Sequence, residues 1–197
     1  MKRTHLLFCI VCCLLLAAFL WGCGGGTGGG GTVYNTVILT ASSGTTLLDS
    51  DVAKHSKAST DAEFCAPTDT ITIEPNDVDV TINSTTIPNL PSFVTASRVR
   101  LDRVTVIFSP ANATSPALPQ QNYTLGSYVE PGGSATVPVR VASQALKQGN
   151  TLSALQCTNK IYRYYVTLRF EGVEINTDQR ETFETTLNVN FSDFVDK

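Results

Sequence analysis

The chain has 197 residues, with 14 Lys and Arg against 17 Asp and Glu, which gives a formal net charge of −3 at neutral pH. Only 16% of the residues are charged, so no basic face of the kind that binds a phosphate backbone is expected. We therefore predict no nucleic acid partner.

Residues 1–22 are typical of an export signal. Lys2 and Arg3 form a basic start, and an apolar run follows from Leu6 to Leu20. This run of about 15 residues is shorter than the roughly 20 that a transmembrane helix needs. A removed signal is therefore favoured over an uncleaved anchor, which stays as an alternative.

The end of this segment, Leu20-Trp21-Gly22-Cys23, resembles the lipobox of bacterial lipoproteins, although the position of Trp21 is usually small. The resemblance implies cleavage before Cys23, a diacylglyceryl thioether on its sulfur and acylation of the new amino terminus. Two or three acyl chains hold a protein firmly to a bilayer. Gly24, next to the cysteine, favours the outer membrane, on its periplasmic face or at the cell surface. A plain secreted protein is the other alternative.

Cleavage there would change the composition of the mature chain. Loss of Lys2 and Arg3 would shift the net charge from −3 to −5, and loss of Trp21 would remove the only tryptophan. Residues 23–32 are a Gly-rich tether with a root-mean-square reach of roughly 15 to 18 Å. We expect no cofactor besides the covalent lipid at Cys23.

Two cysteines, Cys65 and Cys157, lie outside the signal and the lipobox. In an oxidising compartment an even pair is most simply one disulfide. It would close a loop of about 90 residues, worth roughly 4 to 5 kcal/mol in the chain-entropy model, although measured values are commonly 2 to 4. Two free thiols are the alternative.

Residues 33–197 are predicted to form one domain of about eight strands, because apolar and polar residues alternate along much of this length. The strand candidates are residues 33–39, 70–73, 78–87, 97–109, 122–129, 136–141, 162–170 and 183–191. A short helix is predicted at residues 142–148. In the segment 97–109 the apolar phase slips by one residue across Asp102 and Arg103, which predicts a β-bulge or a bend. Pro138 predicts an edge strand.

This pattern predicts an all-β, antiparallel two-sheet β-sandwich. The domain resembles immunoglobulin-like or fibronectin-type sandwiches. The segments "RVTVIFSP", "VEPGGSATVPVRV", "YYVTLRFEG" and "FETTLNVNFSDF" resemble uncharacterised β-sandwich lipoproteins of Gram-negative bacteria over about residues 97–194. That resemblance implies no known activity.

His55 is the only histidine outside the signal. With Asp49 or Asp51 and a serine it could build a hydrolase. It lies in the polar stretch "LLDSDVAKHSKASTDAEF", which is typical of a loop, and no Gly-x-Ser-x-Gly motif occurs. We therefore expect a solvated histidine and no catalytic residues.

Carboxylates offer only weak metal candidates. Asp77 and Asp79 lie two apart on a predicted strand, and with Glu74 or Asn76 they could bind Ca²⁺. A turn followed by an exposed strand face explains them equally well. Glu171, Glu174 and Asp178 fall in a predicted hairpin connection, where solvated charge is expected.

Aromatic residues could support ligand binding. Tyr162 and Tyr164 share a face with apolar residues and are predicted to lie in the core or at its edge, whereas Tyr165 is the outward candidate. Arg163 and Arg169 share the outward face and are predicted to pair with Glu184 across strands.

Taken together, these features predict a membrane-anchored envelope lipoprotein. We expect a non-enzymatic binding or assembly module whose loops or open sheet edge contact another envelope protein, for example by strand addition. An adhesive, small-ligand or glycan-binding module is the alternative, and a hydrolase using His55 is less favoured.

Overall fold

The computed structural model describes residues 31–55 and 70–194. These residues form twelve strands and two short helices. Strands contain 55% of the residues and helices contain 6%, which confirms the all-β class. The expectation of about eight strands is wrong, because several predicted strands are divided and others lie in segments predicted to be loops.

The first sheet, sheet A, is antiparallel and has the order β1-β2-β6-β10. Its strands are β1 (Thr32–Val33), β2 (Val37–Ser43), β6 (Asn76–Thr86) and β10 (Ser134–Ala142).

The second sheet, sheet B, has the order β3-β12-β11-β7-β8, and β9 also pairs with β7. Its strands are β3 (Leu47–Asp51), β7 (Val99–Pro110), β8 (Gln121–Thr124), β9 (Tyr128–Val129), β11 (Tyr162–Glu174) and β12 (Arg180–Ser192). All pairs in sheet B are antiparallel except β3 with β12.

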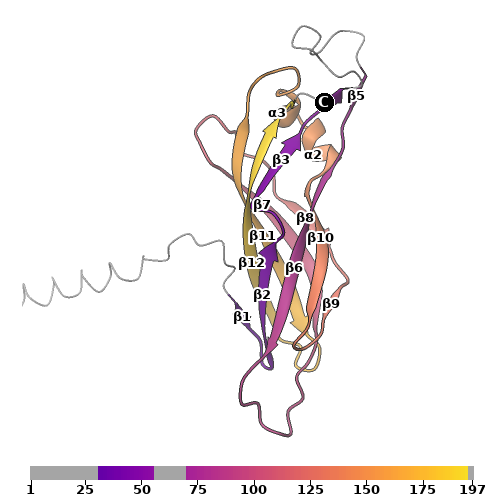
Figure 1. The fold of residues 1–197 in the computed structure, drawn as a ribbon, viewed down its shortest axis with the longest axis vertical. Coiled ribbons are helices and arrows are strands. Elements are labelled where there is room, and N and C mark those ends of the chain that lie inside the picture. The colour runs from indigo at the N-terminus through magenta and orange to yellow at the C-terminus, as the bar shows by residue number, and fades with distance from the viewer. Residues whose placement is uncertain (1–30, 56–69, 195–197) are drawn as a thin grey trace, which may run out of the picture.

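Three smaller features lie beyond one end of these sheets (Figure 1). A two-stranded sheet, sheet C, pairs β4 (Lys54–His55) with β5 (Ile71–Thr72). The helices are α2 (Gln144–Gln148) and α3 (Asn150–Ser153). Ser143 caps α2, because its hydroxyl accepts a bond from the Leu146 N–H. The helix predicted at residues 142–148 is thereby confirmed.

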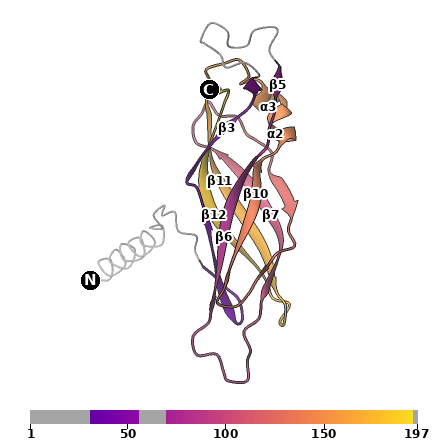
Figure 2. The ribbon, with the colours of Figure 1, turned by 45° about the vertical axis from the view of Figure 1, so that its right-hand side comes forward.

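The molecule is elongated along the strands, and its two ends differ (Figures 1 and 2). We call the end with α2, α3 and β5 the upper end. The opposite, lower end carries the β1–β2 turn (residues 34–36), the β6–β7 loop (residues 87–98) and the β11–β12 turn (residues 175–179). The β6–β7 loop protrudes below the sheets in both views.

One hydrophobic core fills the space between sheets A and B. Leu39, Val80 and Ile82 of sheet A are fully buried, as are Val166 and Leu168 of sheet B. Toward the upper end, the rings of Phe108, Tyr164 and Phe191 pack in mutual contact with centroids 5.7 to 6.2 Å apart.

The chain crosses from one sheet to the other between β2 and β3. The Gly44 N–H still donates to the Asp79 carbonyl of sheet A at 2.9 Å, whereas the Thr46 carbonyl accepts from the Asn188 N–H of sheet B at 2.9 Å. The next strand, β3, then runs parallel to β12. One continuous segment thus links the two sheets along the same side of the core.

The bulge predicted at Asp102 and Arg103 is confirmed. Arg103 pairs with Glu171, but Leu101 pairs with Gly172, so Asp102 is the extra residue in β7. The apolar residues on both sides of it stay buried, which is what the phase slip requires.

The edge position predicted for Pro138 is also confirmed, since β10 is an outer strand of sheet A. The Ser84 N–H donates to the Gly133 carbonyl at 2.9 Å. Because bonded and non-bonded pairs alternate along an antiparallel ladder, the backbone nitrogen of Pro138 faces away from β6. The missing N–H therefore costs no ladder bond.

Two strand predictions fail at turns. The predicted strand 33–39 is a hairpin of β1 and β2, because the chain reverses at residues 34–36. The predicted strand 122–129 is split into β8 and β9, which both pair with β7. In addition, β3 and β4 lie in a stretch predicted to be loop, because each pairs with a segment distant in sequence.

Glu174, predicted to be solvated, is fully buried at the lower end. Its carboxylate accepts hydrogen bonds from the Asn35 and Thr36 N–H groups at 3.2 and 3.0 Å, from the Thr36 hydroxyl, and from the Thr177 hydroxyl at 2.6 Å. A buried carboxylate is stable only with such partners. Glu174 therefore ties the β1–β2 turn to the β11–β12 turn.

We predict that Gly172→Ala destabilises the fold by about 1 to 3 kcal/mol. A Cβ at this position would lie 2.7 Å from the Tyr34 hydroxyl and 2.9 Å from Val99 Cγ1. The measurement is urea unfolding followed by circular dichroism. Gly126→Ala is the matched control, because nothing lies within 4 Å of its Cβ. Equal stability of the two variants would contradict the close packing at Gly172.

Candidate functional site

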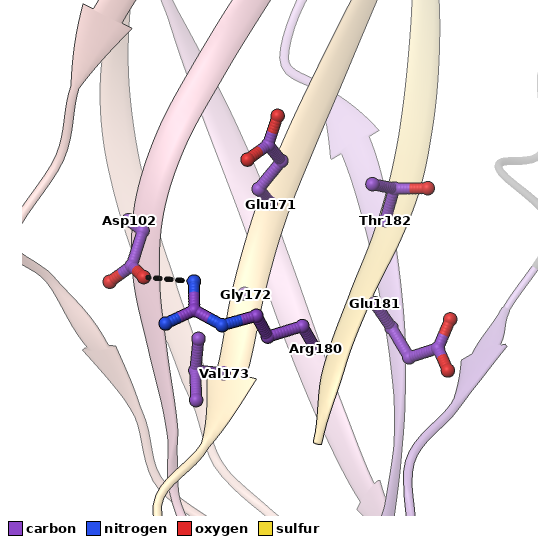
Figure 3. Close-up of a pocket in the computed structure, with 7 residues that line it drawn as sticks. All are labelled: Asp102, Glu171, Gly172, Val173, Arg180, Glu181 and Thr182. Carbon is purple, nitrogen blue, oxygen red and sulfur yellow. Dashed lines mark ion pairs between the residues drawn. The ribbon is translucent and has the colours of Figure 1, made fainter. Parts of the chain in front are cut away.

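The outer face of sheet B carries two hollows, one near each end. The lower hollow has a volume of about 180 Å³. It is lined by Asp102, Glu171, Gly172, Val173, Arg180, Glu181 and Thr182 (Figure 3).

Ion pairs fill this lower hollow. Arg180 extends from β12 across β11, between Glu171 and Val173, to Asp102 on β7, where Nη1 lies 3.6 Å from the carboxylate (Figure 3). Arg100 also donates to Asp102, at 2.6 Å from Nε, and this hydrogen bond lowers the pKa of Asp102. The bulge places Asp102 beside both arginines.

The neighbouring charges are satisfied in the same way. Arg103 donates two hydrogen bonds to Glu171, at 3.1 and 2.7 Å. Further along the face Arg169 pairs with Glu184 at 2.5 Å, which confirms the predicted cross-strand partner of Arg169. A charged ligand would have to displace existing partners here. The charged side chains that line the lower hollow therefore all have partners within the protein.

The upper hollow, which we call the distal groove, has a volume of about 300 Å³. It is lined by Thr46, Leu47, Ala111, Arg163, Tyr164, Tyr165, Asn188 and Asn190. On the three adjacent strands Tyr165 pairs with Asn188, and Asn188 pairs with Leu47. The shorter asparagine on β12 lies between two larger side chains, so the groove runs along β12.

Arg163 distinguishes the distal groove from the lower hollow. Of the seven arginines in residues 31–55 and 70–194, it is the only one without an ion pair. The predicted pairing with Glu184 is wrong for Arg163, because Arg163 lies opposite Asn190 and Glu184 lies opposite Arg169. Its guanidinium group is exposed beside the groove and available to a ligand.

The prediction for the tyrosines is confirmed, with Tyr162 partly buried at the edge of the core. Tyr164 is buried and its hydroxyl donates to the Pro116 carbonyl at 2.7 Å, whereas the side of β11 that faces solvent carries Tyr165 with 60% exposure. Burial raises the pKa of Tyr164 to about 12. Leu47, at 48% exposure, adds an apolar surface on the opposite wall. The groove thus combines an aromatic ring, an apolar side chain, a cation and two amides.

His55 is buried, so the expectation of a solvated histidine is wrong. Its Nε2 lies 3.1 and 3.2 Å from the carboxylate oxygens of Asp193, and the two side chains are 1% and 0% exposed. The aspartate that the described structure places against His55 is thus Asp193, whereas the sequence suggested Asp49 or Asp51. Nothing in the local sequence indicates Asp193, which is 138 residues away and reaches His55 only through the fold.

Asp193 also accepts a hydrogen bond from the Cys157 N–H at 2.5 Å. Cys157 forms a disulfide. Its predicted partner Cys65 lies outside the described residues, as does Cys23, and the pairing of Cys65 with Cys157 stays a prediction. The end of β12, sheet C and the segment after α3 meet at this carboxylate.

Several of the weak calcium candidates bind other protein groups. Asp77 and Asp79 share the exposed face of β6, as the spacing predicts. Asp77 accepts two bonds from Arg140, at 3.0 and 3.3 Å, and Glu74 pairs with Lys54 at 3.8 Å. No group of three or more His, Cys, Asp or Glu side chains that could hold a metal occurs in the described part of the chain.

The amide oxygen of the fourth calcium candidate, Asn76, binds a buried lysine that the sequence did not single out. Lys147 of α2 is 1% exposed, and its Nζ donates to the carbonyls of Asp51 and Glu74 and to Asn76 Oδ1, each at 2.6 Å. Burial lowers the pKa of Lys147 to about 8. The three acceptors match the three N–H donors of an ammonium group. Lys147 thereby fastens α2 to the ends of β3 and β6.

The chain matches no known family model and no curated protein. Among the residues that the structure describes, no helix has the length and hydropathy needed to cross a membrane.

We predict that Lys147 makes stability rise with pH. Its ordinary pKa is 10.5 and its folded pKa is about 8, so between these values the unfolded chain binds more protons. Relative to Lys147→Met, the wild-type free energy of unfolding should therefore increase by about 1 to 3 kcal/mol from pH 8 to pH 10.5. Urea unfolding at a series of pH values measures it.

The matched control is Lys160→Met, at an exposed lysine. A constant difference between wild type and Lys147→Met over the whole pH range would contradict the effect of burial on this amine.

Proposed function

We propose that the chain is an exported lipoprotein, anchored by acyl chains at Cys23, whose domain is a non-enzymatic recognition module of the cell envelope. The motif Leu20-Trp21-Gly22-Cys23 and the basic and apolar segments before it support the anchor. We place the protein at the outer membrane, on its periplasmic face or at the cell surface.

The finer fold that we propose is an immunoglobulin-like β-sandwich. The order β2-β6-β10 in sheet A corresponds to strands A, B and E of that fold, and the order β7-β11-β12 in sheet B corresponds to strands C, F and G. The strand that passes from sheet A to sheet B and the single core between the sheets support the same assignment. Such modules present ligand surfaces on a rigid scaffold.

The proposed recognition surface is the distal groove. The observation that carries this proposal is the unpaired Arg163 beside the exposed Tyr165, on a face where every other described arginine is paired. Arginine and tyrosine are, with tryptophan, the residues enriched among binding hot spots. We propose another envelope protein as the partner.

Strand addition at β10 is less well supported than the distal groove. Pro138 lies in the middle of this edge with its nitrogen facing outward, so an added strand would lack a central hydrogen bond. Exposed Thr136 and Arg140 flank the proline. Natural sheet edges use proline and charge to prevent pairing with other chains.

A glycan or small ligand is the second candidate occupant of the groove. Tyr165 offers a ring for the apolar face of a sugar. The amide oxygens of Asn188 and Asn190 offer acceptors for hydroxyl groups, while their amide nitrogens already donate to the Thr46 carbonyl at 3.3 Å and to the Asp49 carboxylate at 2.8 Å. The hydrolase alternative has less support, because the side chains of His55 and Asp193 are enclosed and pair with each other. A catalytic base must reach its substrate.

We predict that Cys23→Ser releases the protein from the membrane fraction or leaves it as a precursor. The substitution removes the sulfur that would carry the lipid, and the acyl chains are what would hold the protein firmly to the bilayer. Membrane fractionation and intact mass measure the outcome. A variant with the signal removed and unchanged membrane retention would contradict the anchor.

We predict a specific cross-link from the distal groove. A photo-reactive amino acid in place of Tyr165 should capture one dominant envelope protein in cells, and Arg163→Glu should reduce that adduct at least several-fold. Tyr128, a 43% exposed tyrosine at the lower end of sheet B, is the matched control position. Capture from position 128 but not from 165 would contradict the assignment, and no adduct at either would favour a glycan or small ligand.

A further inference from the structure

The β6–β7 loop, residues 87–98, exposes the largest apolar side chain at the lower end. Phe93 is 86% exposed, more than any other large hydrophobic residue among those described. Residues 80–97 contain no charged side chain and no histidine. Pro88, Leu90 and Pro91 also lie in the loop.

The loop is held firmly at its base. Both of its ends bind Thr36 of the β1–β2 turn, because the Ile87 N–H donates to the Thr36 carbonyl at 3.0 Å and the Ser97 N–H donates to the Thr36 hydroxyl at 2.9 Å. Thr36 is fixed in turn by Glu174. Inside the loop, the Val94 N–H donates to the Pro91 carbonyl at 2.8 Å. Phe93 is thus carried outward on an ordered turn.

The same turn lies close in sequence to the entry of the N-terminal tether. Thr32, the first residue of β1, precedes Thr36 by four positions, which span at most about 14 Å of chain. The loop extends below Thr36 by no more than about 17 Å, since its eleven residues 87–97 go out and return. Residues 23–31, fully extended, span up to about 30 Å. Cys23 and the loop tip can therefore reach one and the same surface.

We infer that the β6–β7 loop is a membrane-contact element that inserts Phe93 into the bilayer surface to which Cys23 is anchored. This inference rests on the proposed lipid anchor. An uncharged loop costs little to bring against lipid, and burial of one Phe side chain favours the inserted orientation on the order of 10- to 100-fold. Because the tether keeps the loop at a high local concentration near the membrane, this modest preference is sufficient for insertion.

Membrane contact at the lower end orients the whole molecule. The distal groove lies toward the opposite end of the same elongated domain, near the start of β11 and the end of β12 (Figures 1 and 2). The groove would therefore face away from the bilayer.

The test uses Phe93→Trp in the full-length, lipidated chain, reconstituted in phosphatidylethanolamine and phosphatidylglycerol vesicles with or without brominated acyl chains. The expected result is a blue-shifted emission that brominated lipid quenches at least two-fold. Tyr165→Trp in the distal groove is the matched control and should lose less than a tenth of its emission. Equal emission and equal quenching at the two positions would overturn the inference.

Two further measurements distinguish a failure of the proposed anchor from a failure of the loop inference. Wild-type protein should show no tryptophan emission, because Trp21 is removed with the signal; retained emission would contradict cleavage without bearing on the loop. If Cys23 carries no lipid, an N-terminal His tag in place of residues 1–23 fixes the same variants to nickel-chelating vesicles. A blue shift that depends on protein concentration without vesicles would assign Phe93 to a second copy and overturn the inference.

Discussion

The lower end of the domain depends on one buried carboxylate. Glu174 accepts hydrogen bonds from the Asn35 and Thr36 N–H groups and from the hydroxyls of Thr36 and Thr177. An ionised carboxylate without these donors would be strongly destabilising in this position. Because Thr36 also holds both ends of the β6–β7 loop, the carboxylate fixes three connections at once. The entry of the tether and the exposed Phe93 consequently have a defined relation to each other.

The outer face of sheet B has two regions, which differ in whether their arginines are paired with carboxylates. The bulge at Asp102 brings a carboxylate between Arg100 and Arg180, and the remaining arginines of the lower face have glutamate partners. The asparagines of β12 opposite Tyr165 and Arg163 give no such neutralisation. In the lower region of this face the charged side chains therefore pair with each other. In the region of the distal groove Arg163 stays available to a ligand. Recognition is proposed for the second region for this reason.

The upper end is fastened by polar groups instead of apolar contacts alone. Lys147 donates to three oxygens at the ends of β3 and β6. Asp193 binds both His55 and the Cys157 N–H. Each of these groups would be costly if its partners were lost, so they act as specific fasteners between segments far apart in sequence. The helices and sheet C are held over the core in this way.

Features that depend on local periodicity could be predicted from the amino-acid sequence. The alternation in residues 162–170 and 183–191 predicted β11 and β12, the phase slip predicted the bulge at Asp102, and Pro138 predicted an edge, because side-chain direction alternates along any strand. It also assigned Tyr165 to the outer face. Three other features became known from the folded chain alone: the pairing of His55 with Asp193, the burial of Glu174 and the three acceptors around Lys147. These contacts join residues up to 139 positions apart, and local patterns carry no information about which distant groups will meet when the sheets close.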